Sequence, residues 1–242
     1  MKNPFKFGTV VDDPFFIDRK KEIGKVTSFL SGENHLVLIS PRRMGKSSLI
    51  HKAVSSLGRP VIALDMQLMT GPADLAAQML TRIYRIYPNT RLKQHLKRFR
   101  IIPQLSLNPT TGSIDVSFMP GASSLPILED VLNLAEKLST ENKKLIIVFD
   151  EFQEARRLDE NLLNQLRAIM QHHKMINYVF LGSQESLIRE VFQKKKSPFY
   201  HFAMVMYLKK IDTGEFSQYL EKGFAGIHDE PGRIAGEILE VT

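Results

Sequence analysis

Eight consecutive residues have the types and spacing of a phosphate-binding loop. They are Ser40-Pro41-Arg42-Arg43-Met44-Gly45-Lys46-Ser47, and they follow the pattern G-x-x-x-x-G-K-[ST] except that a serine stands in place of the first glycine. An apolar run, Leu36 to Ile39, precedes them, and an amphipathic run begins at Ser48. In such a strand, loop and helix, backbone N–H groups face a polyphosphate, and the helix dipole favours the anion.

Individual residues of the loop have predicted roles. Gly45 lets the backbone approach the phosphates closely, and Lys46 supplies a positive charge for the β and γ phosphates. The Ser47 hydroxyl is a predicted Mg²⁺ ligand, and Ser48 adds a hydroxyl near the α phosphate. The alternative is a strand-to-helix turn that is rich in small and basic residues by chance. The chain has no Asn-Lys-x-Asp or Thr-Lys-x-Asp motif for guanine, so we expect ATP.

A second motif places two carboxylates at the end of another apolar run, Leu145-Ile146-Ile147-Val148-Phe149-Asp150-Glu151. Ligands of parallel α/β sheets bind at the carboxyl ends of the strands. We expect Asp150 to hold Mg²⁺, mostly through water, and Glu151 to be the catalytic base that polarises the attacking water. Alone, such a run is more often a strand end with solvated carboxylates. The phosphate-binding loop upstream favours the catalytic interpretation.

Two polar features follow further along the chain. Ser183 comes after a predicted strand, residues 175–181, where its hydroxyl could contact the γ phosphate or the water. It could equally cap the helix predicted from Glu185 to Phe192, and both roles are compatible. The adjacent His172 and His173 point in different directions on a helix, which predicts a solvated helix end rather than a metal pair.

The elements that carry these motifs alternate between short apolar runs and amphipathic runs, which predicts an α/β fold. Predicted strands cover residues 36–39, 61–65, 145–150, 175–181 and 203–208. Predicted helices cover residues 23–30, 48–54, 72–87, 128–138, 162–170 and 185–192, with two more after Asp212 and from Pro231. Alternating residues at 105–107 and 114–118 predict a β-hairpin with a turn at 108–112, which we interpret as an insertion of about residues 100–121.

Composition excludes several classes of protein. The 242 residues include no cysteine, so disulfides and cysteine-ligated zinc are excluded. The N-terminus lacks the apolar core of a signal peptide, and no run reaches membrane-spanning length. We therefore expect a cytoplasmic protein with no membrane partner.

The net charge of +7 is concentrated in one interval. No acidic residue lies between Asp74 and Asp115, where there are seven basic ones: Arg82, Arg85, Arg91, Lys93, Lys97, Arg98 and Arg100. The segment from Arg82 to Arg100 therefore predicts contact with nucleic acid or an acidic protein face, although basic helices are often plain solvated surface. Tyr84, Tyr87 and Phe99 could stack on bases, but at helical spacing such aromatics are more often core.

Together these motifs resemble those of the archaeal-type ATPases of the STAND class, which are relatives of AAA+ and origin-recognition ATPases. The likeness spans about residues 1 to 220. It rests on the phosphate-binding loop and on Ile17-Asp18-Arg19-Lys20-Lys21-Glu22-Ile23, Phe149-Asp150-Glu151-Phe152-Gln153 and Ser197-Pro198-Phe199-Tyr200. The resemblance implies a three-layer α/β/α P-loop NTPase fold with a parallel sheet of order 5-1-4-3-2. It also implies that Phe16, Ile17 and Arg19 line the adenine pocket.

The resemblance further implies an ATPase domain over residues 1–210 and the start of a helical lid over residues 211–242, as in a shortened form. His201-Phe202 stands where many relatives have a Gly-Arg pair, so that arginine is missing. The leading expectation is an ATP-dependent switch with slow hydrolysis, which could oligomerise in a longer form. One alternative is a nucleic-acid-loading ATPase. Another is a non-hydrolysing scaffold, which Lys46, Asp150 and Glu151 argue against.

Overall fold

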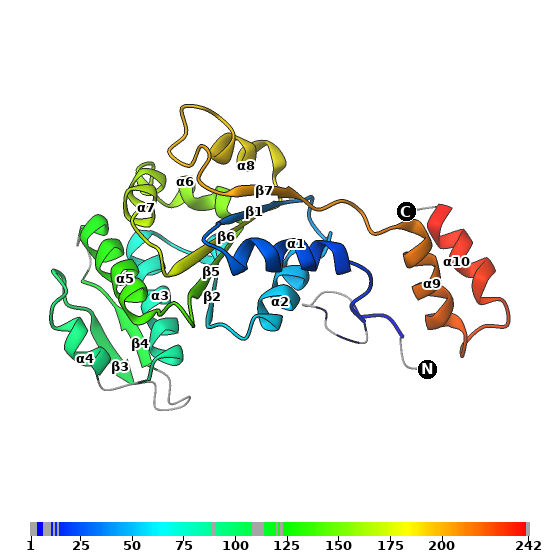
Figure 1. Cartoon of the computed structure of the whole chain (residues 1–242), viewed down its shortest axis with the longest axis horizontal. Helices are drawn as coiled ribbons and strands as arrows, with labels where there is room; N and C mark the ends of the chain where they lie inside the picture. The colour runs from blue at the N-terminus through cyan, green and yellow to red at the C-terminus, as the bar shows by residue number, and fades with distance from the viewer. Residues whose placement is uncertain are drawn as a thin grey trace.

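The computed structural model describes residues 4–6, 11, 13, 15–88, 91–107, 114–119, 121 and 123–240. Within them, a parallel sheet lies between two layers of helices, and a pair of helices lies apart from the sheet at one end (Figure 1). This arrangement confirms the predicted α/β/α class. The turn predicted at residues 108–112 falls outside the described residues.

Five parallel strands form the central sheet. They are β1 (Leu36–Ile39), β2 (Val61–Asp65), β5 (Leu145–Asp150), β6 (Ile176–Gly182) and β7 (Met204–Tyr207). Their order is β2-β5-β6-β1-β7, which is the predicted order read from the opposite edge. β1 and β6 are buried at every position, as expected for central strands with helices on both faces.

Different helices cover the two faces of the sheet. α1 (Lys20–Ser31) and α2 (Lys46–Ser56) pack on one face, against Leu36 and Leu38 of β1. The other face carries α3 (Pro72–Ile86), α5 (Ser124–Leu138), α7 (Leu162–Met170) and α8 (Glu185–Phe192). Short helical turns η1 (Met66–Leu68), η2 (Phe152–Glu154) and α6 (Ala155–Leu158) follow the ends of β2 and β5. Alternate residues of β1 point to opposite faces, which is why one short strand contributes to both hydrophobic clusters.

The predicted hairpin is present beside α3. It consists of the antiparallel strands β3 (Gln104–Leu107) and β4 (Ile114–Ser117), with Leu105 opposite Val116, and α4 (Arg91–Leu96) precedes it. β4 packs against α3. Tyr84 and Phe99 are buried and Tyr87 packs against the same cluster, so these aromatics belong to the core.

The last two helices, α9 (Thr213–Phe224) and α10 (Pro231–Glu240), pack against each other beyond the end of the sheet (Figure 1). The Asp212 carboxylate caps α9 by accepting hydrogen bonds from the N–H groups of Gly214 (2.9 Å) and Glu215 (3.2 Å). The Phe5 ring lies 5.0 Å from that of Phe224 on α9. Within the described ranges, no helix is both long and apolar enough to cross a membrane.

A buried polar network connects the entry to β1 with α5 and β6. His173 Nδ1 lies 2.6 Å from the Tyr178 hydroxyl, and His173 Nε2 lies 3.0 Å from Asn133 Oδ1. The Tyr178 N–H donates to His35 Nδ1 at 3.2 Å. The predicted solvated helix end is therefore wrong for His173, because α5 and β6 supply partners that bury it.

This network predicts a loss of stability in acid. Burial, reinforced by the nearby charges of His173 and Arg167, lowers the pKa of His35 to about 4. The unfolded chain binds this proton near pH 6.5, so the contribution of His35 is intact above that pH and is lost as pH falls to 4. The loss is about 3 kcal/mol of unfolding free energy. Urea unfolding across this pH range measures it.

A His35→Asn chain is the control for this prediction, because an asparagine side-chain oxygen can accept from Tyr178 N–H but does not titrate. The pKa of His173 is also lowered by burial, so both chains should lose some stability in acid. The difference between their pH profiles isolates His35. Parallel profiles would show that His35 is already accessible to protons in the folded chain.

Candidate functional site

The predicted phosphate-binding loop connects β1 to α2. Arg43 and Gly45 have positive φ angles of 65° and 80°, and Gly45 directly precedes α2. Gly45 is needed for this backbone conformation rather than for space, because no atom lies within 4 Å of a Cβ built there. Among described residues, no group accepts a hydrogen bond from the N–H groups of residues 42–48. The loop therefore offers a row of donors to an anion.

Lys46 lies across the concave side of this loop. Its side chain is buried, and its ammonium donates to the carbonyl oxygens of Ser40 (3.1 Å) and Pro41 (3.2 Å). Burial lowers the pKa of Lys46, although the carboxylates of Glu151 and Asp150 act to raise it. The ammonium is thus within the loop, where a phosphate could replace the two carbonyl oxygens.

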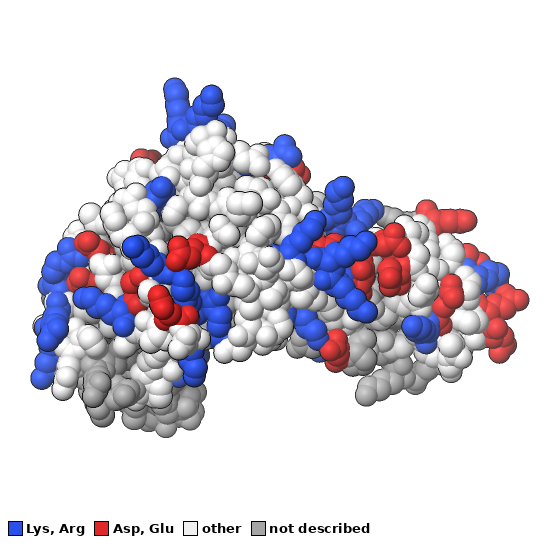
Figure 2. All heavy atoms as spheres, viewed as in Figure 1, with Lys and Arg blue, Asp and Glu red and all other residues white. Residues whose placement is uncertain are grey.

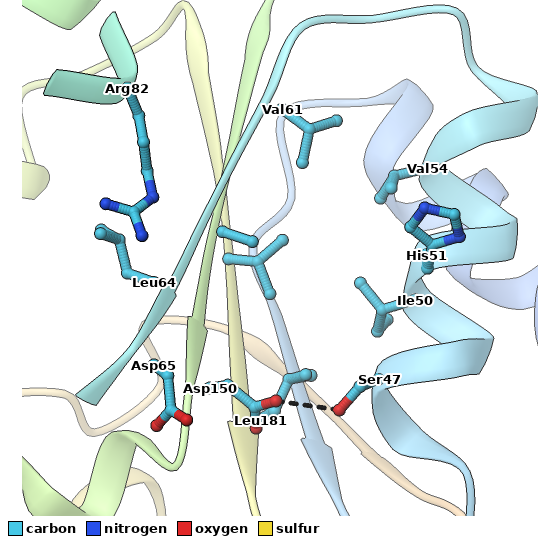
Figure 3. Close-up of a pocket in the computed structure, with 12 residues that line it drawn as sticks. Ser47, Ile50, His51, Val54, Val61, Leu64, Asp65, Arg82, Asp150 and Leu181 are labelled. Carbon is cyan, nitrogen blue, oxygen red and sulfur yellow. Dashed lines mark hydrogen bonds between the residues drawn. The ribbon is translucent and has the colours of Figure 1, made fainter. Parts of the chain in front are cut away.

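Ser47 and Asp150 form the candidate metal pair. The Ser47 hydroxyl donates to Asp150 Oδ2 at 2.9 Å (Figure 3). Neighbouring ligands of an octahedral Mg²⁺, each about 2.1 Å from the ion, are also about 2.9 Å apart, so these two oxygens fit one ion. Burial raises the pKa of Asp150, although hydrogen bonds from Ser47 and from the Glu151 N–H oppose this shift.

The rest of a magnesium shell would come from other sources. In the part of the chain that the structure describes, there is no group of three or more His, Cys, Asp or Glu side chains able to hold a metal. Mg²⁺ commonly keeps several waters and takes only one or two protein ligands beside substrate phosphates. The Ser47–Asp150 pair matches that mode of binding.

Glu151 follows Asp150 in a left-handed conformation, with φ 50° and ψ 45°. Its Oε2 accepts hydrogen bonds from Ser183 Oγ (2.6 Å) and Gln153 Nε2 (2.5 Å). Burial acts to raise the pKa of Glu151, but these hydrogen bonds and the Lys46 charge outweigh it and the pKa is lowered. Ser183 does not cap α8, because Gln184 holds the N-cap position and no side chain caps that helix. The Ser183 hydroxyl therefore lies at the site, on Glu151, and its contact with the γ phosphate or the water stays a prediction.

The residues expected around the adenine lie just before α1. Phe16 and Ile17 are half-buried, and the Lys52 ammonium lies 5.9 Å from the centre of the Phe16 ring. Arg19 is buried, and it donates to the Lys209 carbonyl (2.6 Å) in the connection between β7 and α9. Its guanidinium is therefore engaged with the protein.

The remaining loop residues divide by exposure. The side chains of Arg42 and Arg43 are exposed, and Met44 is half-buried. The Ser48 hydroxyl accepts a hydrogen bond from the Val11 N–H at 3.0 Å. Ser48 therefore connects the N-terminal segment to the start of α2, a contact that the motif does not predict.

A cavity of about 320 Å³ lies beside the metal pair, between α2 and the part of the sheet near edge strand β2 (Figure 3). Asp65 at the end of β2 pairs in register with Asp150 and lines it, together with Arg82 from α3. Most of the residues that line the cavity are apolar. Sequence patterns did not predict this cavity. The only signal was that Asp65, like Asp150, ends a predicted strand.

Two of the basic side chains that the structure describes in this segment are engaged with other groups of the protein. Arg82 lines the cavity beside β2 (Figure 3) and donates to Gln78 Oε1 at 2.8 Å, and Arg100 pairs with Glu129 (2.7 Å) and Asp130 (3.1 Å) of α5. Lys97 and Arg98 are exposed. Figure 2 shows basic and acidic side chains mixed over the end of the molecule that carries α4 and α5.

One family model matches most of the chain. A family model described as "ATPase domain predominantly from Archaea" matches residues 16–241. Among curated proteins, none matches this chain.

Three solved structures share the fold. The Walker-type ATPase PABY2304 of Pyrococcus abyssi superposes with a TM-score of 0.70 at 22% identity, over 98% of this chain and 66% of that one. The Aeropyrum pernix ORC2 protein, solved with ADPNP and ADP, gives 0.59 at 15% identity, over 93% and 56%. The Aeropyrum pernix ORC1 protein, solved with DNA, gives 0.55 at 13% identity, over 87% and 50%. This chain thus spans about two thirds or less of these relatives' lengths.

Proposed function

The chain belongs to the family of ATPase domains found predominantly in Archaea, and on this basis we propose that it is a molecular switch that binds Mg-ATP and hydrolyses it slowly. One observation carries the proposal: the loop donors, the Ser47–Asp150 pair and Glu151 all lie at the carboxyl ends of β1 and β5. Bound nucleotide at that edge would contact the phosphate-binding and the acidic motif together.

Each residue has a specific role in this proposal. The loop from Ser40 to Lys46 holds the phosphates, with Ser48 near the α phosphate. Ser47 and Asp150 hold Mg²⁺, which when bound neutralises charge on the phosphate oxygens. Glu151, whose carboxylate Ser183 holds, orients the attacking water and accepts its proton.

We expect slow turnover because no described arginine is bonded to the catalytic groups. No arginine among the described residues forms a hydrogen bond or ion pair with Glu151 or the Ser47–Asp150 pair. Arg156 and Arg157, which follow Glu151 in the chain, pair instead with Glu190 and Glu154. An arginine that stabilises transition-state charge is worth about a thousandfold or more in rate.

We further propose that residues 1–210 are the ATPase domain and residues 211–242 a lid-like unit, as in a STAND-class switch. Phe16, Ile17 and Arg19 would lie near the adenine. Arg19 also donates to the Lys209 carbonyl, which lies just before this unit, so it links the start of α1 to the segment that leads into α9. A change in the bound nucleotide could alter the position of α9 and α10 through that connection.

A second candidate function is nucleic-acid binding through the segment from Arg82 to Arg100. The DNA complex of the structurally similar ORC1 protein and the exposed Lys97 and Arg98 support it. An acidic protein face is the other candidate partner for this surface. The ion pairs of Arg100 and the burial of Tyr84 and Phe99 leave fewer groups for nucleic acid than the sequence suggests.

Steady-state ATPase assays with and without DNA, beside a DNA titration at several salt concentrations, separate these functions. For a switch we expect turnover of this chain far below about one per second, without stimulation by DNA. Rapid turnover by the isolated chain would contradict the switch. DNA binding that falls steeply with salt, and weakens further when Lys97 and Arg98 are replaced by glutamate, would instead support the second function.

A further inference from the structure

Gln153 is a buried polar residue two positions after Glu151, and neither motif gives it a role. It lies in η2, the turn that follows β5, and its side chain is only 6% exposed. A buried amide needs partners for two donors and an oxygen acceptor. The partners that Gln153 has, and the one that it lacks, indicate its function.

The amide of Gln153 donates to the same carboxylate oxygen as Ser183 does. Glu151 Oε2 accepts from Gln153 Nε2 at 2.5 Å and from Ser183 Oγ at 2.6 Å. Hydrogen bonds to a charged acceptor are short and strong, and two of them restrict rotation of the carboxylate. Because both side chains bond Oε2, the lone pairs of Oε1 keep their capacity to accept from a water.

The other end of the Gln153 amide has no partner. Its Oε1 is buried and, within the described residues, accepts no hydrogen bond. Rotating the amide by 180° would not help, since it would place that oxygen against the Glu151 carboxylate. Leaving a buried acceptor unpaired destabilises a fold. A glutamine selected for stability alone would therefore be a poor choice here.

The backbone under Gln153 is held firmly by its neighbour Phe152. The Phe152 ring is fully buried and lies 4.5 Å from the ring of Phe180 on β6 and 5.3 Å from that of Phe199. The Glu154 N–H also closes the turn by donating to the Glu151 carbonyl at 2.9 Å. Gln153 therefore projects from a rigid turn, as a group that must position another side chain requires.

We propose that Gln153 is a positioning residue for ATP hydrolysis: with Ser183 it fixes Oε2 of Glu151, so that Oε1 faces the attacking water. This inference rests on the proposed function of Glu151 as the base. Gln153 contacts neither the loop nor the Ser47–Asp150 pair among the described residues, so it acts on the rate and not on nucleotide binding.

A Gln153→Met chain tests this role, because methionine has a similar length and shape but neither donates to Glu151 nor buries an unpaired oxygen. We expect kcat to fall about ten- to a hundredfold, as for other small misplacements of a reacting group. KM and the dissociation constant for Mg-ATP should stay within about twofold, and the urea midpoint should not fall. In a Glu151→Gln chain, the same substitution should change the residual rate less than about twofold.

Gln165→Met on α7 is the matched control, since the Gln165 side chain accepts from Ser124 Oγ (3.3 Å), away from the site, and kcat should be unchanged. An unchanged or higher kcat for Gln153→Met would overturn the proposal, and so would a loss of ATP affinity in step with the urea midpoint. If parent turnover depends on Glu151 but not on Gln153, only this inference fails. A parent chain without any turnover would overturn both this inference and the proposed hydrolysis.

Discussion

Replacing Lys46 with alanine should lower the affinity for Mg-ATP at least about a hundredfold and leave the chain folded. A hydrogen bond to a charged group contributes about 1.5–3 kcal/mol, and the ammonium would make such bonds to two phosphates. In the absence of nucleotide it bonds only two loop carbonyls, Ser40 and Pro41. Burial of the ammonium, which lowers its pKa, offsets these two bonds, so the unfolding free energy should change by only about 1 kcal/mol. Titration calorimetry and urea unfolding measure the two quantities.

Lys144→Ala is the control for this variant. Lys144 is a second partly buried lysine, and its ammonium lies 3.6 Å from Glu33, outside the site. Its removal should leave ATP affinity within about twofold of the parent. If the Lys46 variant instead binds ATP as the parent does, residues 40–47 are an ordinary turn between β1 and α2.

The sheet could be predicted from the sequence because buried parallel strands are continuous apolar runs. β1, β5 and β6 have this pattern, and their order follows from the resemblance. What could not be predicted depends on contacts between distant segments. In the sequence Arg100 lies in a stretch without acidic residues, but α5 brings Glu129 and Asp130 to it from about 30 residues away.

The candidate site was predictable to a similar extent. Spacing alone indicates Lys46 and Ser47, and the strand end indicates Asp150. The sequence could not distinguish the two roles of Ser183, because a serine before a helix can cap that helix or can contact bound phosphate or water. In the structure the hydroxyl donates to Glu151 and does not cap α8. Gln153 is part of a motif that carries the resemblance, but the motif gives it no role, since only the turn after β5 directs its amide back to Glu151.

Replacing Glu151 with glutamine should leave ATP bound but reduce its hydrolysis about a hundred- to ten-thousandfold. That range is typical of removing a general base. Nucleotide binding should persist, because the Ser47–Asp150 pair, Lys46 and the loop donors do not depend on the Glu151 charge. Loss of a negative charge near the γ phosphate should if anything raise the affinity. Single-turnover assays with labelled ATP, beside calorimetry, measure rate and affinity separately.

Glu154→Gln is the matched control for this base assignment, since it makes the same chemical change three residues further on. The Glu154 carboxylate pairs with Arg157 at 3.1 Å and does not reach Glu151, so turnover should stay within about twofold of the parent. Equal losses in both variants would indicate a general effect on the turn after β5. Unchanged turnover in Glu151→Gln would show that Glu151 is not the base. The positioning role proposed for Gln153 would then fail as well. A loss of hydrolysis confined to Glu151, with ATP still bound, would instead establish that binding and cleavage depend on separate residues, which a switch governed by bound ATP requires.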